Sequence, residues 1–154
     1  MVPAVNAGTI LFLYRAESKY EQNNMGKQFT LGKNERLKSR KQIELLFSEG
    51  KKFSMTPFKV HYLFDESATQ PLQFGVGVSN KNFKKAVDRN KIKRRIREAY
   101  RLQKISLQQK VKVKKSPCRM FIIYTGKEMP EYSEAFVRVN KILEKLCHII
   151  DSEK

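Results

Sequence analysis

The chain has 154 residues, 40% of them hydrophobic, and carries 32 Lys and Arg against 15 Asp and Glu, for a formal net charge of +17. This length fits one domain with a modest core, and so large a charge repels itself unless a polyanion such as nucleic acid or an anionic membrane neutralises it. With no apolar run of about 20 residues and no amphipathic helix with large aromatic anchors, we expect no membrane partner.

The first 24 residues differ from the rest because their charges cancel. Their apolar run, from Thr9 to Tyr14, has no Lys or Arg before it and is too short for a signal-peptide core. Basic sequence begins at Met25. We therefore predict a disordered or dispensable extension over residues 1–24 and one domain over residues 25–154.

The first predicted elements are a helix and two strands. Ser39 precedes Gln42 at the capping-box spacing, and apolar residues then recur at helical intervals up to Gly50, which predicts a short helix. Alternating apolar residues over 58–64 and over 72–79 predict two half-buried strands joined by a polar loop.

The second half of the chain returns to helical periodicity. It predicts a helix over residues 84–104, a polar Lys-rich loop over 106–115, a strand over 117–124 and a closing helix from Ser133. This order, without internal repeats, is typical of the α+β class.

The two cysteines, Cys118 and Cys147, lie far apart and form no CxxC pair. They indicate neither a disulfide framework nor a zinc site. We expect both to be small buried hydrophobic residues in a protein of the reducing cytoplasm.

Positive charge is concentrated between Lys81 and Lys104, where eleven Lys or Arg and two acids give a local net charge of +9. On a helical wheel, one face of this segment is apolar and is expected to pack on a sheet: Ile92, Ile96, Ala99 and Tyr100. The neighbouring and opposite sector is basic and polar: Asn90, Lys93, Arg94, Arg97, Arg101 and Lys104. A solvated face usually mixes both signs, so we interpret this sector as a polyanion-binding surface.

A glycine-containing run, Phe74-Gly75-Val76-Gly77-Val78-Ser79, precedes the basic segment, which contains Arg89, Asn90, Lys91, Ile92, Lys93, Arg94 and, three positions later, Arg97. This arrangement resembles the signature of the bacterial ribonuclease P protein component. The family usually has Arg where this chain has Lys91. Lysine keeps the positive charge but lacks the planar guanidinium group that makes bidentate contacts. The resemblance extends from about Leu31 to Ile150.

The resemblance implies a small basic subunit of a ribonucleoprotein that removes the 5′ leader from precursor tRNA, with the active site and the Mg²⁺ ions held by ribonuclease P RNA. The implied fold is a mixed four-stranded sheet packed with three helices and a left-handed β-α-β crossover, similar to domains of a ribosomal small-subunit protein and of elongation factor G. The residues implied to bind the catalytic RNA are Arg89, Asn90, Lys91, Lys93, Arg94, Arg97 and Arg101. We expect no catalytic or metal-binding residue on the protein, no obligate protein partner and a cytoplasmic location.

The resemblance also implies a cleft for the leader between the first helix and the sheet. Its candidate residues are Phe47, Phe58, Val60, His61 and Lys51, with Lys52 and Phe53 beside them. Family members often carry two Phe four residues apart on the first helix; here the first position is Ile43, so only Phe47 carries over. Aromatic rings would stack on bases with about 1–3 kcal/mol each, whatever the sequence.

Several alternatives stay open from the sequence. Phe47 and Phe58 are also spaced like core residues, and His61 suits an idle surface position as well as a leader contact. A structural RNA-binding protein, such as a ribosomal or assembly factor, is the alternative function. A nuclease that uses its own side chains is a distant third, because His61 and His148 are the only histidines and no carboxylate pair has a telling spacing.

Overall fold

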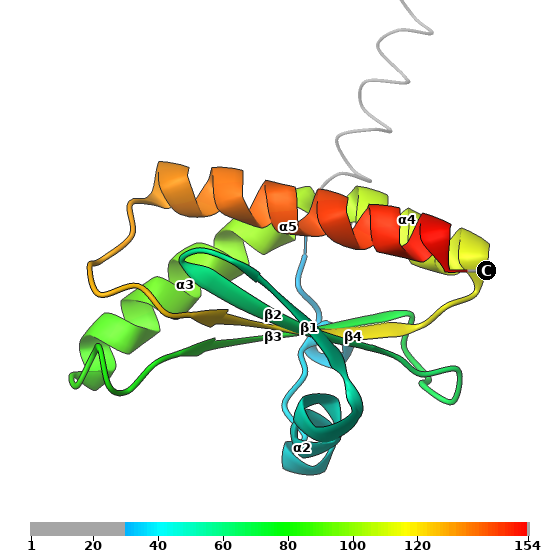
Figure 1. Cartoon of the computed structure of the whole chain (residues 1–154), viewed down its shortest axis with the longest axis horizontal. Coiled ribbons are helices and arrows are strands. Elements are labelled where there is room, and N and C mark those ends of the chain that lie inside the picture. The colour runs from blue at the N-terminus through cyan, green and yellow to red at the C-terminus, as the bar shows by residue number, and fades with distance from the viewer. Residues whose placement is uncertain (1–29, 154) are drawn as a thin grey trace, which may run out of the picture. The chain divides into compact units, whose positions relative to one another are not determined.

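The computed structural model describes residues 30–153, so the predicted extension over residues 1–24 lies outside the described residues. The elements are η1 (Lys33–Glu35), α2 (Arg40–Glu49), β1 (Lys51–Met55), β2 (Phe58–Phe64), β3 (Leu72–Val78), α3 (Ala86–Gln103), α4 (Ile105–Lys114), β4 (Cys118–Tyr124) and α5 (Tyr132–Ser152). Figure 1 shows α3, α4 and α5 on one side of the sheet and α2 on the other. None of the described helices is both long enough and apolar enough to span a membrane.

The sheet has the strand order β1-β2-β4-β3. β2 is antiparallel to both β1 and β4, whereas β3 is parallel to β4. Parallel neighbours need a crossover, and here it runs through α3 and α4. The predicted α+β fold with a mixed four-stranded sheet is therefore confirmed, while the handedness of the crossover stays a prediction.

The described part of the chain contains four α-helices, one more than predicted. The additional helix, α4, replaces the polar loop predicted over residues 106–115. Its Leu107 and Val111, four residues apart, are fully buried, while its lysines face outward or, like Lys110, bind α5. The high lysine content hides this narrow apolar stripe in the sequence.

Strand β1 was not evident from sequence periodicity either. It is an edge strand whose exposed residues include Lys51, Lys52 and Ser54. Charged side chains are common on edge strands because they oppose pairing with another chain. Its pairing with β2, from Lys51 opposite Tyr62 to Met55 opposite Phe58, completes the sheet.

The predicted first helix is confirmed, with both of its ends as expected. The Ser39 hydroxyl accepts a hydrogen bond from the backbone amide of Gln42, at 3.5 Å. At the other end, a Cβ on Gly50 would lie 2.3 Å from the carbonyl oxygen of Leu46 and 2.9 Å from that of Tyr62. Only glycine therefore lets the chain turn directly from α2 into β1.

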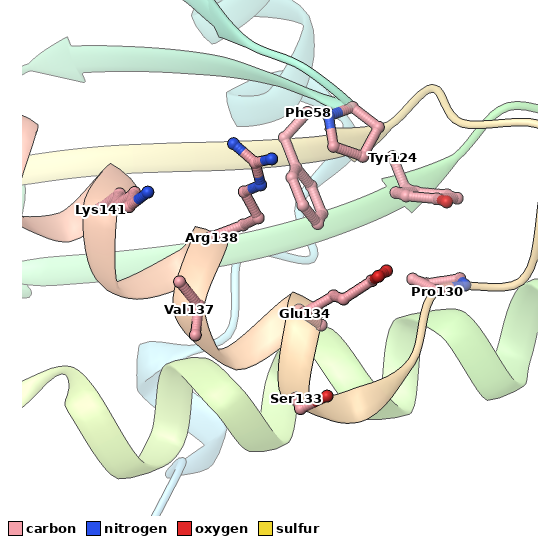
Figure 2. Close-up of a pocket in the computed structure, with 10 residues that line it drawn as sticks. Phe58, Tyr124, Pro130, Ser133, Glu134, Val137, Arg138 and Lys141 are labelled. Carbon is pink, nitrogen blue, oxygen red and sulfur yellow. The ribbon is translucent and has the colours of Figure 1, made fainter.

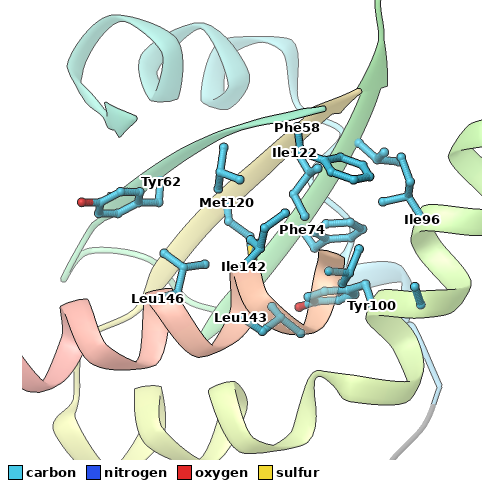
Figure 3. Close-up of a cluster of buried hydrophobic side chains, with 14 of the residues drawn as sticks. Phe58, Tyr62, Phe74, Ile96, Tyr100, Met120, Ile122, Ile142, Leu143 and Leu146 are labelled. Atoms are coloured by element: carbon cyan, nitrogen blue, oxygen red, sulfur yellow. The ribbon is translucent and has the colours of Figure 1, made fainter. Parts of the chain in front are cut away.

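The core lies between the sheet and the helices α3 and α5 (Figure 3). The predicted apolar face of α3 is confirmed, since Ile92, Ile96, Ala99 and Tyr100 are all buried. The Tyr100 ring stacks on Phe74 of β3 with centroids 3.8 Å apart. Burial also raises the pKa of the Cys118 thiol to about 12, so this residue acts as a small hydrophobic group, as predicted.

A buried ion pair joins η1 to the junction of α3 and α4. The Lys104 ammonium, 1% exposed, lies 2.7 Å from a carboxylate oxygen of Glu35. The same carboxylate accepts hydrogen bonds from Gln108 and from the Gly32 amide. Burial tends to raise the pKa of Glu35, but the contacts with Lys104, Gly32 and Gln108 outweigh it and the pKa is lowered. Lys104, predicted to lie on the polyanion-binding sector, is instead a structural residue.

Replacing Glu35 with Gln should lower the free energy of unfolding by about 3 kcal/mol, because the buried Lys104 ammonium loses its carboxylate. Urea denaturation would measure the loss. The matched control is Glu44→Gln, which breaks an exposed ion pair with Arg40 and should change stability little. A loss for Glu35→Gln no larger than that of the control would contradict the structural role of the pair.

Candidate nucleic-acid interface

The exposed side of α3 carries several basic residues. Asn90, Lys91 and Arg94 are all exposed, and we call these three residues the docking ridge. Arg97, also predicted to bind the catalytic RNA, is exposed as well and lines a pocket at the edge formed by β3. The only acids on α3 are Asp88 and Glu98, and Glu98 is paired with Arg101. The ridge therefore presents positive charge and an amide to solvent with little neutralisation from its own helix.

Three other predicted RNA-binding residues of α3 are half-buried. The Arg89 guanidinium donates hydrogen bonds to the carbonyl oxygens of Phe83, at 2.8 Å, and Lys84, at 2.7 Å, and so stabilises the entry into the helix. Arg101 is half-buried and paired with Glu98, and Lys93 is half-buried. RNA contact by Arg89, Lys93 and Arg101 stays a prediction, but none of them belongs to the exposed ridge.

A groove runs beside α2 on the sheet face that is opposite to the core. Its volume is about 750 Å³, and it is lined in part by Phe47, Lys52, Lys59, His61 and Ile123. The Phe47 ring, 41% exposed, packs edge-on against His61 at 4.6 Å and against Phe121 at 5.3 Å between centroids. Aromatic surface beside lysines is the combination that binds single-stranded nucleic acid. We call this surface the α2 groove.

Two predicted groove residues belong to the core instead. Phe58 and Val60 are 2% and 0% exposed and face the helices α3 and α5, because successive side chains of a strand point to opposite faces of the sheet. They cannot contact a strand in the α2 groove, so their assignment as leader-binding residues is corrected. The same alternation places His61 on the groove face, as the sequence predicted.

The predicted leader contact Lys51 is exposed but does not line the α2 groove, and its contact with the leader stays a prediction. Lys51 lies opposite Tyr62, a core residue, and its ammonium binds Glu153 at 2.7 Å. Its neighbour Lys52 lies opposite His61 and lines the groove. Of the two candidate lysines, only Lys52 lines the groove, because the strand register places it opposite His61.

Phe121, which packs against Phe47 on the groove side of the sheet, was not among the candidates predicted from the sequence. It lies on β4 between the core residues Met120 and Ile122, so its alternation could have signalled the opposite face. Gly75 and Gly77 of β3 make room for its ring: a Cβ on them would come within 2.4 Å and 2.9 Å of Phe121. The two glycines of the recognised motif therefore accommodate this aromatic ring.

The surroundings of His61 favour its neutral form. Partial burial lowers the pKa of His61, and the positive charges of Lys52 and Lys59 lower it further. A neutral imidazole can stack on a base without a strong desolvation penalty. No carboxylate contacts it in the interactions of the described chain, so it lacks the orienting partner of a catalytic base.

A separate hollow of about 420 Å³ lies on the core side, between the β1–β2 turn and α5 (Figure 2). Its walls include Tyr124, Glu134, Arg138 and Lys141. The mixture of charges does not match a polyanion. Within residues 30–153, no group of three or more His, Cys, Asp or Glu could hold a metal ion.

Comparisons with known proteins agree with this geometry. Residues 31–147 match the family model described as Ribonuclease P. A ribonuclease P protein component of Porphyromonas gingivalis is 33% identical over 125 residues, which cover 80% of this chain and 91% of that protein. A protein of the same name from Dictyoglomus turgidum is 38% identical over 81 residues, 53% of this chain and 66% of its own. A solved structure of a Staphylococcus aureus RNase P protein mutant with defective mRNA degradation activity shares the fold, with a TM-score of 0.50 and 23% identity over 86% of this chain and 96% of that one.

The lowered pKa of His61 should make the stability of the protein fall in mild acid. Below about pH 6.5 the unfolded chain takes up a proton that the folded His61 resists, so the stability present above that pH is lost as the pH falls. We expect thermal unfolding temperatures of the wild type to fall more than those of His61→Phe between about pH 7.5 and about pH 5.5. Parallel curves for the two proteins would contradict this.

Proposed function

The chain belongs to the ribonuclease P protein family, and from that membership we propose that it is the protein subunit of a ribonucleoprotein that removes the 5′ leader from precursor tRNA. The docking ridge on α3 would bind ribonuclease P RNA, and the α2 groove would bind the leader. We place this assembly in the cytoplasm, where precursor tRNA is found in bacteria.

The observation that carries this proposal is that two surfaces suited to RNA lie apart from each other. The docking ridge lies on the exposed side of α3, whereas Phe47, His61 and Lys52 line a groove on the other face of the sheet. A protein with two such surfaces can hold a catalytic RNA and a substrate strand at the same time. Mature tRNA lacks the leader, so contacts in the groove would favour substrate over product.

The chemistry is assigned to RNA. Mg²⁺ would be held by the catalytic RNA and by substrate phosphates, and it would activate the attacking water there. The described residues contribute no three-ligand cluster for the ion, and His61 has no carboxylate to orient it as a base. The role of the protein residues is then to bind and position the two RNA strands.

Reconstitution tests the function directly. Purified full-length chain is added to its cognate catalytic RNA and precursor tRNA at physiological Mg²⁺, and 5′ maturation is followed on a gel. We expect the protein to accelerate cleavage and to lower the precursor concentration that is needed. Binding to RNA without any stimulation of cleavage would instead favour a structural RNA-binding protein.

Replacing Arg94 with Ala should weaken binding of the catalytic RNA and lower the dependence of log affinity on log salt by about 0.7 to 0.9, the value of one phosphate contact. Filter binding at several salt concentrations measures the slope. The matched control is Arg138→Ala, which removes an equally charged, exposed residue from α5. An unchanged slope for Arg94→Ala, or equal changes in both variants, would contradict the docking ridge.

A further inference from the structure

A second basic pocket lies on the α2 side of the sheet, at the edge formed by β3. Its volume is about 370 Å³, and its lining includes Arg36, Lys38, Ile43, Gly75, Arg97 and Phe121. Three of these residues are cations, and no acid lines the pocket. We call it the arginine pocket.

The two arginines reach the pocket from different elements. Arg36 is held at the sheet edge by a bridge to Phe74, with the Leu37 amide donating to the Phe74 carbonyl oxygen at 2.9 Å. Arg97 comes from α3, and burial together with the charge of Arg36 lowers its pKa. Both arginines line the same pocket, so their like charges repel each other.

The nearest carboxylate in the sequence does not relieve this repulsion. Glu35 precedes Arg36, but its oxygens accept from Lys104, Gln108 and the Gly32 amide. Neither Arg36 nor Arg97 takes part in an ion pair among residues 30–153. Two planar guanidinium groups that line one pocket without a counter-charge are suited to a phosphate group, because phosphate accepts several charge-assisted hydrogen bonds.

The arginine pocket and the α2 groove form two ends of one surface. Ile43, which lines the pocket, and Phe47, which lines the groove, are four residues apart on α2 and so share a face of the helix. Phe121 also lines the pocket and packs against Phe47. A strand that lies along α2 can therefore contact both.

We infer that Arg36 and Arg97, with Lys38 beside them, bind a single phosphodiester of the leader strand. The inference rests on the proposed function and deepens it. The inference takes the cleavage junction to lie nearest to α3, the helix on which the catalytic RNA would dock. The arginine pocket, to which α3 contributes Arg97, then takes a leader phosphate close to the junction, and Phe47 and His61 contact nucleotides farther from it.

A series of precursor tRNAs with leaders of increasing length tests this order. The affinity of each precursor, relative to mature tRNA, is measured with the holoenzyme made from wild-type chain, Arg36→Gln, Arg97→Gln or Phe47→Ala. Some precursors have leaders only just long enough for them to bind more tightly than mature tRNA. We expect the arginine variants to bind even these precursors with about tenfold lower affinity. Phe47→Ala should lose affinity only with longer leaders.

The control variant is Arg40→Gln, which removes one charge from the same segment but lies outside the pocket and pairs with Glu44. Arg36→Lys keeps the positive charge but not the planar guanidinium group, so it should lose less affinity for precursor than Arg36→Gln. The double variant of Arg36 and Arg97 should lower the salt slope for leader binding by about 0.7 in total, because both residues bind one phosphate. Circular dichroism tests whether each variant is folded. If Arg36→Gln is not folded, the affinity of Arg36→Lys for precursor is compared with that of the wild type instead.

The outcomes separate this inference from the proposed function. A wild-type holoenzyme that binds precursor and mature tRNA equally overturns leader binding altogether. The arginine pocket alone is overturned by a different result. In that case the wild-type holoenzyme prefers precursor to mature tRNA and Phe47→Ala abolishes this preference, but Arg36→Gln and Arg40→Gln bind precursor with equal affinity. Arg36→Gln could also weaken binding of the protein to catalytic RNA alone as much as it weakens binding of the holoenzyme to precursor. That result would assign the pocket to the docking surface and also overturn the inference.

Discussion

The alternation of side chains along β2 and β4 is the constraint on which the rest of the structure depends. Each strand contributes one set of residues to the core under α3 and α5 and another to the groove beside α2. Val60 and Ile122 are fully buried, whereas His61 and Phe121, their chain neighbours, face the groove. A shift of one residue in register would exchange these sets, so the core that stabilises the sheet also fixes the groove.

The large positive charge is divided between binding and structure. Some cations are satisfied inside the protein: Lys104 by Glu35, Arg89 by backbone carbonyls, and Arg119 by Asp65 at 2.7 Å. These groups hold η1, the start of α3 and the end of the sheet in place. The exposed cations, such as Arg94 and those of the arginine pocket, stay open to solvent. Net charge alone therefore overstates the positive surface that a partner can reach.

Glu35 links these two uses of charge. By accepting hydrogen bonds from Lys104, Gln108 and the Gly32 amide, it fixes the segment that carries Arg36 along the edge of β3. The same contacts keep its carboxylate from neutralising the neighbouring arginine. A buried ion pair of this kind adds less stability than its short distance suggests, but it can specify one arrangement of the elements it joins.

The sequence by itself determined the elements with strong periodicity, the apolar face of α3 and the motif that led to the family. It was sufficient because those features depend on spacing within one segment, as in Ile92 and Ile96 or in Arg94 and its neighbours. Only the tertiary structure decided that α4 is a helix, that Lys52 rather than Lys51 lines the groove, and that Arg36 meets Arg97. Those outcomes depend on strand register and on contacts between distant segments, which local spacing does not encode.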